Sequence, residues 1–214
     1  MHLDSVTVIF FAGLIIAIIL HEVSHGVVAN FLGDPTAKEA GRLTLNPIPH
    51  IDPFGSIVIP VLGALTHLPV IGWAKPVPVN PARLHNRRRD MLIVSLAGPV
   101  TNFSLAIVAA LVARSQFHSN GASSFFIVDL PKPVLVPLLF AEVNLFLGVF
   151  NFLPIPPLDG AALIERVLPH AWLPGWYRFR PYGILVLFLL ALRTNILGRL
   201  FQPFLDHLYR FVFR

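Results

Sequence analysis

The distribution of apolar residues constrains this chain more than any other feature of its sequence. Only 13% of the residues are charged, about half the share found in soluble domains, and 55% are hydrophobic. This composition excludes a soluble globular enzyme and predicts an all-α, multi-pass membrane protein, with residues 1–214 forming a single membrane-embedded domain. Four apolar segments approach the roughly 20 residues that cross a bilayer core: Val6–Leu32, Met91–Ala113, Val134–Leu153 and Tyr182–Phe201.

A shorter apolar segment, Phe54–Val70, is interrupted by two glycines and two prolines. These breakers predict a re-entrant or interfacial element in place of a straight span. The overlapping stretch Gly41–Pro60 combines Pro and Gly with short apolar runs, which predicts short β-strands; the alternative is an ordinary interfacial loop. Arg193 and Arg199 predict that the far end of the fourth span leaves the hydrocarbon and continues as an interfacial helix to Arg214.

The basic residues predict how the chain is oriented. The net charge is +5, but the positive charges lie between apolar segments and do not form a stripe, which indicates membrane topology and no nucleic-acid partner. Lys and Arg are concentrated in residues 71–90 and sparse in residues 114–132, so the loop before Met91 is expected in the cytoplasm. If Phe54–Val70 re-enters, His21 and Asp159 come to a similar depth in the cytoplasmic half of the bilayer.

The first apolar segment contains the motif His21-Glu22-Val23-Ser24-His25. Residues four apart on an α-helix point the same way, so both imidazoles can bind one Zn²⁺ at about 2.0–2.1 Å. Glu22 lies beside them, where it can reach a water molecule at the metal. The alternative is a chance pentapeptide with two core histidines. Ionisable residues are costly in a membrane span and usually functional, which favours the metal site.

A catalytic zinc site needs a third protein ligand. The chain has no cysteine, so that ligand must be His, Asp or Glu. Asp159 is the candidate, because three prolines between Asn151 and Gly160 must end or unwind the preceding helix and open the backbone there. The alternative is that Asp159 caps a helix starting at Ala161.

The chain resembles the site-2 proteases, a family of intramembrane zinc metalloproteases, and most closely the compact prokaryotic type without a PDZ or CBS module. The resemblance is carried by His21–His25, Ala97-Gly-Pro-Val-Thr-Asn102, the stretch from Asn151 to Gly160, and Gly72-Trp-Ala-Lys-Pro-Val-Pro-Val-Asn80. It implies that His21, His25 and Asp159 hold one Zn²⁺ per chain and that Glu22 activates water. It also implies single-span membrane proteins as substrates and a location in the cell membrane.

Three asparagines accompany these motifs. Asn151 lies eight residues before Asp159, and its amide could donate a hydrogen bond to the oxyanion of the reaction, a role that the resemblance supports. The alternative for Asn151 is a polar contact between helices. We interpret Asn144 as structural, and Asn102 as a packing residue or a residue behind the metal ligands.

The sequence therefore predicts a zinc endopeptidase in the bilayer that cuts transmembrane substrates near the cytoplasmic side. A helical substrate must unwind before attack, and Gly41–Pro60 could offer it a strand edge. The alternative is a metal transporter or a non-proteolytic metal-binding scaffold. A transporter usually repeats its architecture in two halves, and this sequence shows no internal repeat.

Overall fold

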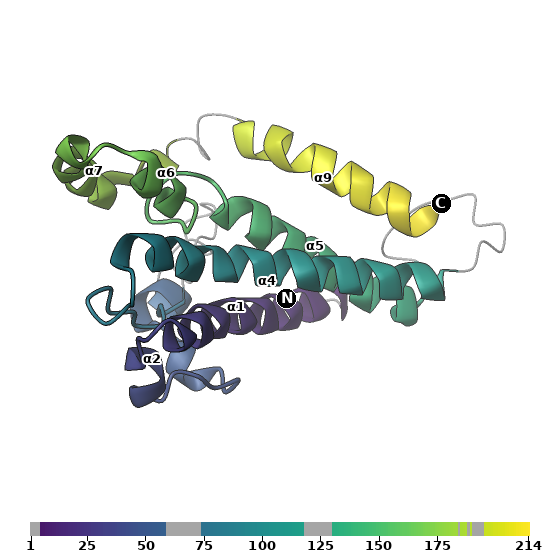
Figure 1. The fold of residues 1–214 in the computed structure, drawn as a ribbon. Coiled ribbons are helices and arrows are strands. Elements are labelled where there is room, and N and C mark those ends of the chain that lie inside the picture. Colours follow the sequence, from purple (N-terminus) through teal and green to yellow (C-terminus); the bar gives the residue numbers. More distant parts are fainter. Residues whose placement is uncertain (1–4, 59–73, 118–129, 184, 188, 190–194) are drawn as a thin grey trace.

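The computed structural model describes residues 5–58, 74–117, 130–183, 185–187, 189 and 195–214, and within these ranges it contains helices and no strands. Three helices are long and apolar enough to cross a membrane: α1 (Ser5–Phe31), α4 (Arg87–Gln116) and α5 (Lys132–Asn151). They lie side by side, with α4 against both α1 and α5 (Figure 1). The all-α prediction is confirmed for the described residues, and three of the four predicted spans coincide with helices long and apolar enough to cross a membrane.

Short helices occupy the connections. They are α2 (Thr36–Glu39), η1 (Ile48–His50), η2 (Pro53–Val58), α6 (Ala161–Val167), η4 (His170–Trp172), α7 (Leu173–Phe179) and η5 (Arg180–Tyr182). The carboxyl ends of α1 and α5 lie at the same end of the molecule as the amino end of α4 (Figure 1). The segments that follow α1 and α5 therefore meet at one end of the three-helix group.

The outer face of α1 is apolar and uncovered. Only 17% of its most apolar window is buried inside the protein, and Phe11, Ile15 and Ile16 are each more than half exposed. Soluble proteins rarely expose a continuous apolar surface of this kind. The helix is therefore suited to contact with lipid along most of its length.

Helix α4 begins four residues before its predicted start at Met91. The side chain of Asn86 accepts a hydrogen bond from the Arg89 N–H at 3.2 Å, and Asp90 accepts one from the Asn86 N–H at 2.7 Å. These two side chains satisfy backbone donors that the first helical turn leaves free. A span defined by hydropathy alone misses the turn because its residues Arg87–Asp90 are charged.

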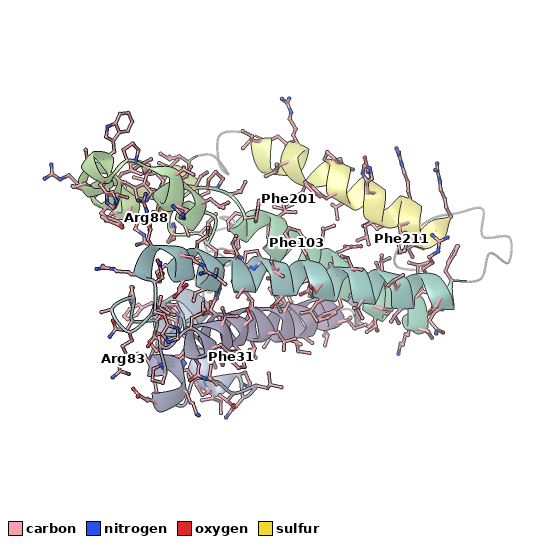
Figure 2. All side chains as sticks on the ribbon, viewed as in Figure 1. Phe31, Arg83, Arg88, Phe103, Phe201 and Phe211 are labelled. Carbon is pink, nitrogen blue, oxygen red and sulfur yellow. The ribbon has the colours of Figure 1, made fainter. Side chains whose placement is uncertain are left out.

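The predicted fourth span, Tyr182–Phe201, lies partly outside the described residues. Helix α9 (Ile196–Phe213) starts inside that range and extends well beyond it. It lies along α4 and α5, where Leu208 and Val212 join a core cluster with alanines of α4 (Figure 1). The small alanine side chains let the helices approach closely. Figure 2 shows Phe201 and Phe211 at opposite ends of α9.

The strands expected in Gly41–Pro60 are absent from the described part of this stretch, residues 41–58, and that prediction is wrong there. The local polar side chains make turns instead: Thr44 accepts a hydrogen bond from the Asn46 N–H, and Asn46 accepts one from the Ile48 N–H. Such side-chain bonds compete with strand pairing, and the prolines remove ladder donors. The predicted re-entrant segment Phe54–Val70 lies outside the described residues beyond its first five, which belong to η2.

The buried carboxylate of Asp34 joins the end of α1 to the extended segment 74–80. It accepts hydrogen bonds from the Asn80 N–H at 2.6 Å and from the N–H and hydroxyl of Thr36. Burial by itself would raise the pKa of Asp34, but these bonds and the charge of Arg83 outweigh it and hold the pKa below its ordinary value of 3.8. Asp34 therefore stabilises the fold in its ionised form.

We expect Asp34→Asn to lower the stability of the protein at neutral pH by about 1–3 kcal/mol, because one backbone donor loses its acceptor. The contribution of Asp34 is complete above its ordinary pKa of 3.8 and is lost as the pH falls through the lower folded value. The difference in melting temperature between wild type and variant should thus shrink on acidification below that value. Asp206→Asn on α9 is the matched control, and a difference that widened at low pH would contradict the prediction.

Candidate metal centre

The residues predicted as metal ligands come together at one point. The Nε2 atoms of His21 and His25 lie 3.1 Å apart, and Oδ2 of Asp159 lies 3.0 Å from the first and 3.3 Å from the second. Both histidines are buried, with 6% and 8% of their surfaces exposed. His21 and Asp159 meet as expected for residues at a similar depth, because α1 and α5 run toward the same end of the molecule.

The protons on the two imidazoles are assigned by their outer hydrogen bonds. Nδ1 of His25 lies 2.7 Å from the Val94 carbonyl oxygen, which can only accept, so this nitrogen carries the proton. Nδ1 of His21 lies 2.6 Å from Oδ1 of Asn102. If both Nδ1 atoms donate, both Nε2 atoms turn a lone pair toward the point between the ligands.

A chain of two asparagines fixes the direction of the bond to His21. Asn144 donates from Nδ2 to the Phe140 carbonyl at 2.8 Å, so its Oδ1 is left to accept the Nδ2–H of Asn102 at 2.9 Å. Asn102 therefore presents its own Oδ1 to His21 as an acceptor. Both asparagines are fully buried. The Phe140 carbonyl of α5 thus determines, through the two asparagines, the tautomer of His21 on α1.

These donor atoms fit a zinc ion. Ligands held at about 2.0–2.1 Å in tetrahedral geometry stand about 3.3 Å apart, close to the three separations observed. Oδ2 of Asp159 is buried and accepts no hydrogen bond from any described residue, although it lies against both imidazoles. Three mutually facing acceptors repel one another, whereas a cation between them satisfies all three. A His₂–carboxylate set of this kind is a donor set that zinc favours.

Backbone contacts hold Asp159 in place. The Gly160 N–H donates to the Asn151 carbonyl at 2.7 Å and closes the loop that follows α5. A Cβ on Gly160 would lie 2.5 Å from the carbonyl oxygen of Leu153, so only glycine fits this turn. Gly160 is also the N-cap of α6, without a side-chain cap, and the alternative role of Asp159 as the cap is wrong.

Arg88 connects α6, the helix that follows this loop, to α4. Its Nη2 donates to the carbonyls of Glu165 and Leu168 at 3.1 and 2.6 Å, at the carboxyl end of α6. A cation is favourable at this end of a helix, where carbonyl groups are unpaired. Figure 2 shows Arg88 at the amino end of α4, on the side of α6. Asp159 is thereby held between two anchored elements.

Gly98 gives the histidines the room that they need. A Cβ on this residue would lie 2.5 Å from Nε2 of His25 and 2.6 Å from Nε2 of His21. Pro99 follows it inside α4 and removes a helical hydrogen bond in the turn that also contains Val94. Because Gly98 has no side chain, this turn of α4 lies directly against the candidate metal-binding atoms.

The candidate centre opens into a cavity of about 580 Å³. Glu22 lies in its wall, and its Oε2 accepts a hydrogen bond from the Val77 N–H at 2.8 Å. The remaining lining is mainly apolar and comes from α1, α4, α5 and the segment before α4, including Ile18, Val79, Met91, Leu147 and Phe150. A carboxylate at the rim of a mainly apolar cavity is suited to proton transfer with water largely excluded.

Asn151, the predicted oxyanion donor, also lines this cavity. Its Nδ2 donates to the Leu147 carbonyl of its own helix at 3.1 Å, and this is the bond that the structure shows for its side chain. The amide therefore has to turn away from α5 before it can meet a ligand. Its role in catalysis stays a prediction.

Sequence reasoning interpreted Asn102 as a packing residue or a residue behind the metal ligands and Asn144 as structural, but it named no partner for either and gave Gly98 no task. The structure places Asn102 behind His21. The signals were present: a glycine–proline pair and two asparagines within apolar helices, where unpaired amides are costly. What the sequence lacked was the pairing of α1 with α4 and of α4 with α5. Only that pairing identifies His21 as the group at the end of the asparagine chain.

Three known proteins with similar sequences are each named a "Putative zinc metalloprotease". The chain is 38% identical over 202 residues to "Putative zinc metalloprotease YwhC" of Bacillus subtilis, covering 90% of this chain and 84% of that protein. It is 31% identical over 200 residues to "Putative zinc metalloprotease Rip2" of Mycolicibacterium smegmatis, covering 92% and 71%. A stretch of 87 residues is 38% identical to "Putative zinc metalloprotease MJ0611" of Methanocaldococcus jannaschii, covering 37% and 35%.

No family model matches the chain, and no solved structure matches it significantly. The extent and identity of the similarity to YwhC are nevertheless sufficient to place the chain in the same family. The chain belongs to the site-2 protease-like family of zinc metalloproteases.

Gly98→Ala should abolish metal binding, since the added methyl group would lie where the histidines present Nε2. We expect zinc content, measured by atomic emission on purified protein, to fall from about one per chain to near zero. Gly175→Ala is the matched control, because nothing lies within 4 Å of a Cβ at that position. Full zinc occupancy in Gly98→Ala would show that α4 is not packed against the ligands.

Asn102→Leu should weaken zinc binding by about 10- to 100-fold, because His21 loses the acceptor that fixes its ring. The measurement is competition against a fluorescent chelator in detergent. Ser104→Ala on the same helix is the control, since that exposed hydroxyl donates to the Val100 carbonyl of its own helix. Equal affinities for wild type and Asn102→Leu would contradict the proposed orienting chain.

Proposed function

We propose that this chain is an intramembrane zinc endopeptidase that hydrolyses peptide bonds within the transmembrane segments of single-span membrane proteins. The observation that carries the proposal is the convergence of His21, His25 and Asp159 at the end of three apolar helices, beside a carboxylate in an apolar cavity. Each feature is needed by a hydrolase whose substrate reaches it through the bilayer.

The first task is to hold the metal. His21 and His25 from α1 and Asp159 from the loop after α5 would be its three protein ligands. A bound zinc ion supplies Lewis acidity toward the scissile carbonyl and makes a water molecule acidic enough to attack near neutral pH. The asparagine chain and the Val94 carbonyl keep both imidazoles in the orientation that this task requires.

The second task is proton transfer, which we assign to Glu22. It follows His21 directly on α1, lies in the cavity wall, and is not one of the three converging donors. Its carboxylate would take the proton of the attacking water and deliver it to the leaving amine. Positioned groups of this kind contribute about 10²- to 10⁴-fold to a rate. The Val77 N–H keeps one oxygen in place and leaves the other available for the proton.

The third task is to stabilise charge on the substrate carbonyl. Asn151 is our candidate donor, because it lines the same cavity as Glu22 and Asp159. Its amide would exchange the Leu147 carbonyl of α5 for the substrate oxyanion. A single positioned donor of this type is worth about 10²- to 10³-fold in kcat. The substrate must be extended at this point, since a helix keeps its carbonyls bonded internally.

The site would face the cytoplasmic side of the cell membrane. Arg83 and the three arginines 87–89 lie at the end of the molecule where α1 and α5 finish, and exposed cations next to membrane spans favour the cytoplasm. Figure 2 shows Arg83 at this end, near Phe31. Cleavage would then release the cytoplasmic part of a substrate.

Glu22→Gln should abolish cleavage and retain zinc, because the amide cannot accept the proton but does not disturb the ligands. Asp159→Ala should lose both zinc and cleavage. The assay uses purified protein in lipid vesicles, a transmembrane peptide with a helix-breaking centre, and parallel zinc analysis. Wild-type cleavage should stop when a chelator is added and return with zinc.

Two outcomes would contradict the proposal. Zinc bound at one per chain without cleavage of any peptide in a panel would instead support a metal-binding scaffold. Cleavage that survives in Glu22→Gln would assign the proton transfer to another group. Asp52→Ala, a carboxylate outside the centre that caps the turn of η2, is the control and should retain both zinc and activity.

A further inference from the structure

Arg42 is a buried cation without an acidic partner. Its side chain is only 8% exposed, and no carboxylate of a described residue lies within ion-pair distance of it. Its Nη2 donates to the Lys75 carbonyl at 2.7 Å and lies 3.4 Å from the Pro76 carbonyl oxygen. Its Nε is buried and makes no hydrogen bond to any described residue. Burying a guanidinium against carbonyls alone is costly, which calls for a reason.

The carbonyl groups that Arg42 contacts lead directly to Glu22. The Pro76 carbonyl belongs to the same peptide unit as the Val77 N–H, and that N–H donates to Oε2 of Glu22 at 2.8 Å. A peptide unit carries a dipole of about 3.5 D with its positive end at the N–H. The cation therefore faces the negative end of this dipole and the carboxylate faces its positive end, so both charges favour the same orientation of the peptide.

The surrounding residues leave this peptide unit little freedom. Prolines at 76 and 78 restrict the backbone on either side of Val77 and leave its N–H as the donor between them. Gly26 lies one helical turn after Glu22, and a Cβ there would come within 2.9 Å of Val77 Cγ1 and 2.5 Å of Leu43 Cδ2. The absence of a side chain on Gly26 thus lets residues 43 and 77 pack against α1 beside Glu22.

Neighbouring backbone bonds hold both sides of the contact. The Lys75 N–H donates to the His50 carbonyl at 2.9 Å, and the Arg42 N–H donates to the Ala37 carbonyl at 2.9 Å. Asp34 holds the other end of the segment through Asn80. Arg42 is accordingly placed between fixed elements. Besides its bond to the Lys75 carbonyl, its guanidinium lies against the carbonyl of the peptide unit whose N–H meets the Glu22 carboxylate.

We propose that Arg42 is a positioning residue for Glu22, acting through the peptide unit between Pro76 and Val77. The inference rests on the proposed role of Glu22 in peptide hydrolysis. Arg42 contacts none of the candidate ligands and does not itself line the cavity, although it contacts the carbonyl of Pro76, which does. Its removal should loosen the Val77 N–H and let the Glu22 carboxylate rotate out of place, while the metal-binding atoms remain where they are.

Two measurements test this in the full-length protein in detergent or vesicles. Hydrogen exchange at the Val77 amide should become about tenfold faster in Arg42→Leu, because its bond to Glu22 opens more often. With the transmembrane peptide as substrate, kcat should fall by about 10- to 100-fold, part of the contribution of a positioned base, with KM changed less than about twofold. Zinc content should stay at one per chain.

Further variants separate positioning from folding. Arg42→Lys keeps the charge but loses the planar, forked guanidinium. Its kcat and its Val77 exchange rate should lie between those of wild type and Arg42→Leu. Arg42→Ala leaves a space that added guanidinium ion can enter, and millimolar guanidinium should restore part of kcat and slow Val77 exchange. Arg83→Leu, which removes an exposed arginine paired with Glu39, is the control and should change neither quantity.

Unchanged Val77 exchange in Arg42→Leu would overturn the inference whether or not the wild-type protein cleaves the peptide, so its failure is distinct from failure of the proposed function. Equal loss of zinc and activity in Arg42→Leu and Arg42→Ala, without rescue by guanidinium, would assign Arg42 a purely structural role and would also overturn it.

Discussion

The arrangement of three lone-pair donors around one point is the constraint on which the rest of this structure depends. His21, His25 and Asp159 bring acceptor atoms within 3.3 Å of one another with no proton donor among them, a grouping that a cation stabilises. Each imidazole must therefore carry its proton on Nδ1, the ring nitrogen that faces away from the other candidate ligands. The Val94 carbonyl and the Asn102–Asn144 chain meet that requirement, and both come from helices other than the one that carries the motif.

The apolar surroundings make this constraint strict. Polar groups buried among apolar helices cannot rely on water, so each amide of the chain behind His21 is paired, ending at a backbone carbonyl of α5. Close packing is equally necessary. Gly98 of α4 leaves room for the imidazoles of His21 and His25, and Gly26 of α1 leaves room for Leu43 and Val77. Polar pairing and small residues together fix the positions of the ligands and of Glu22. The same logic extends to Arg42, whose charge is placed at the carbonyl end of the peptide that binds Glu22.

Much of the candidate centre could be predicted from the sequence. The spacing of His21 and His25 requires only an α-helix, and the prolines before Asp159 require only that α5 end near Asn151. The strands expected in Gly41–Pro60 do not form in the described part, because the side chains of Thr44 and Asn46 accept hydrogen bonds from nearby backbone N–H groups. The pattern of apolar residues does not reveal these local bonds. A helix continuing to the end of the chain was predicted after Arg193, and α9 (Ile196–Phe213) agrees with it; its packing against α4 and α5 could not be read from hydropathy.

By itself, the sequence determined the class of the molecule, the metal-binding motif and the carboxylate beside it, because helix periodicity and hydropathy are local properties. The tertiary structure decided the rest. It showed that Asp159 reaches the histidines, that the asparagines orient His21, that glycines at 26 and 98 admit close packing, and that Arg42 and Glu22 share a peptide unit. Each of these depends on which helix faces which across distances of up to 138 positions along the chain, as between His21 and Asp159, and no local pattern encodes such a pairing.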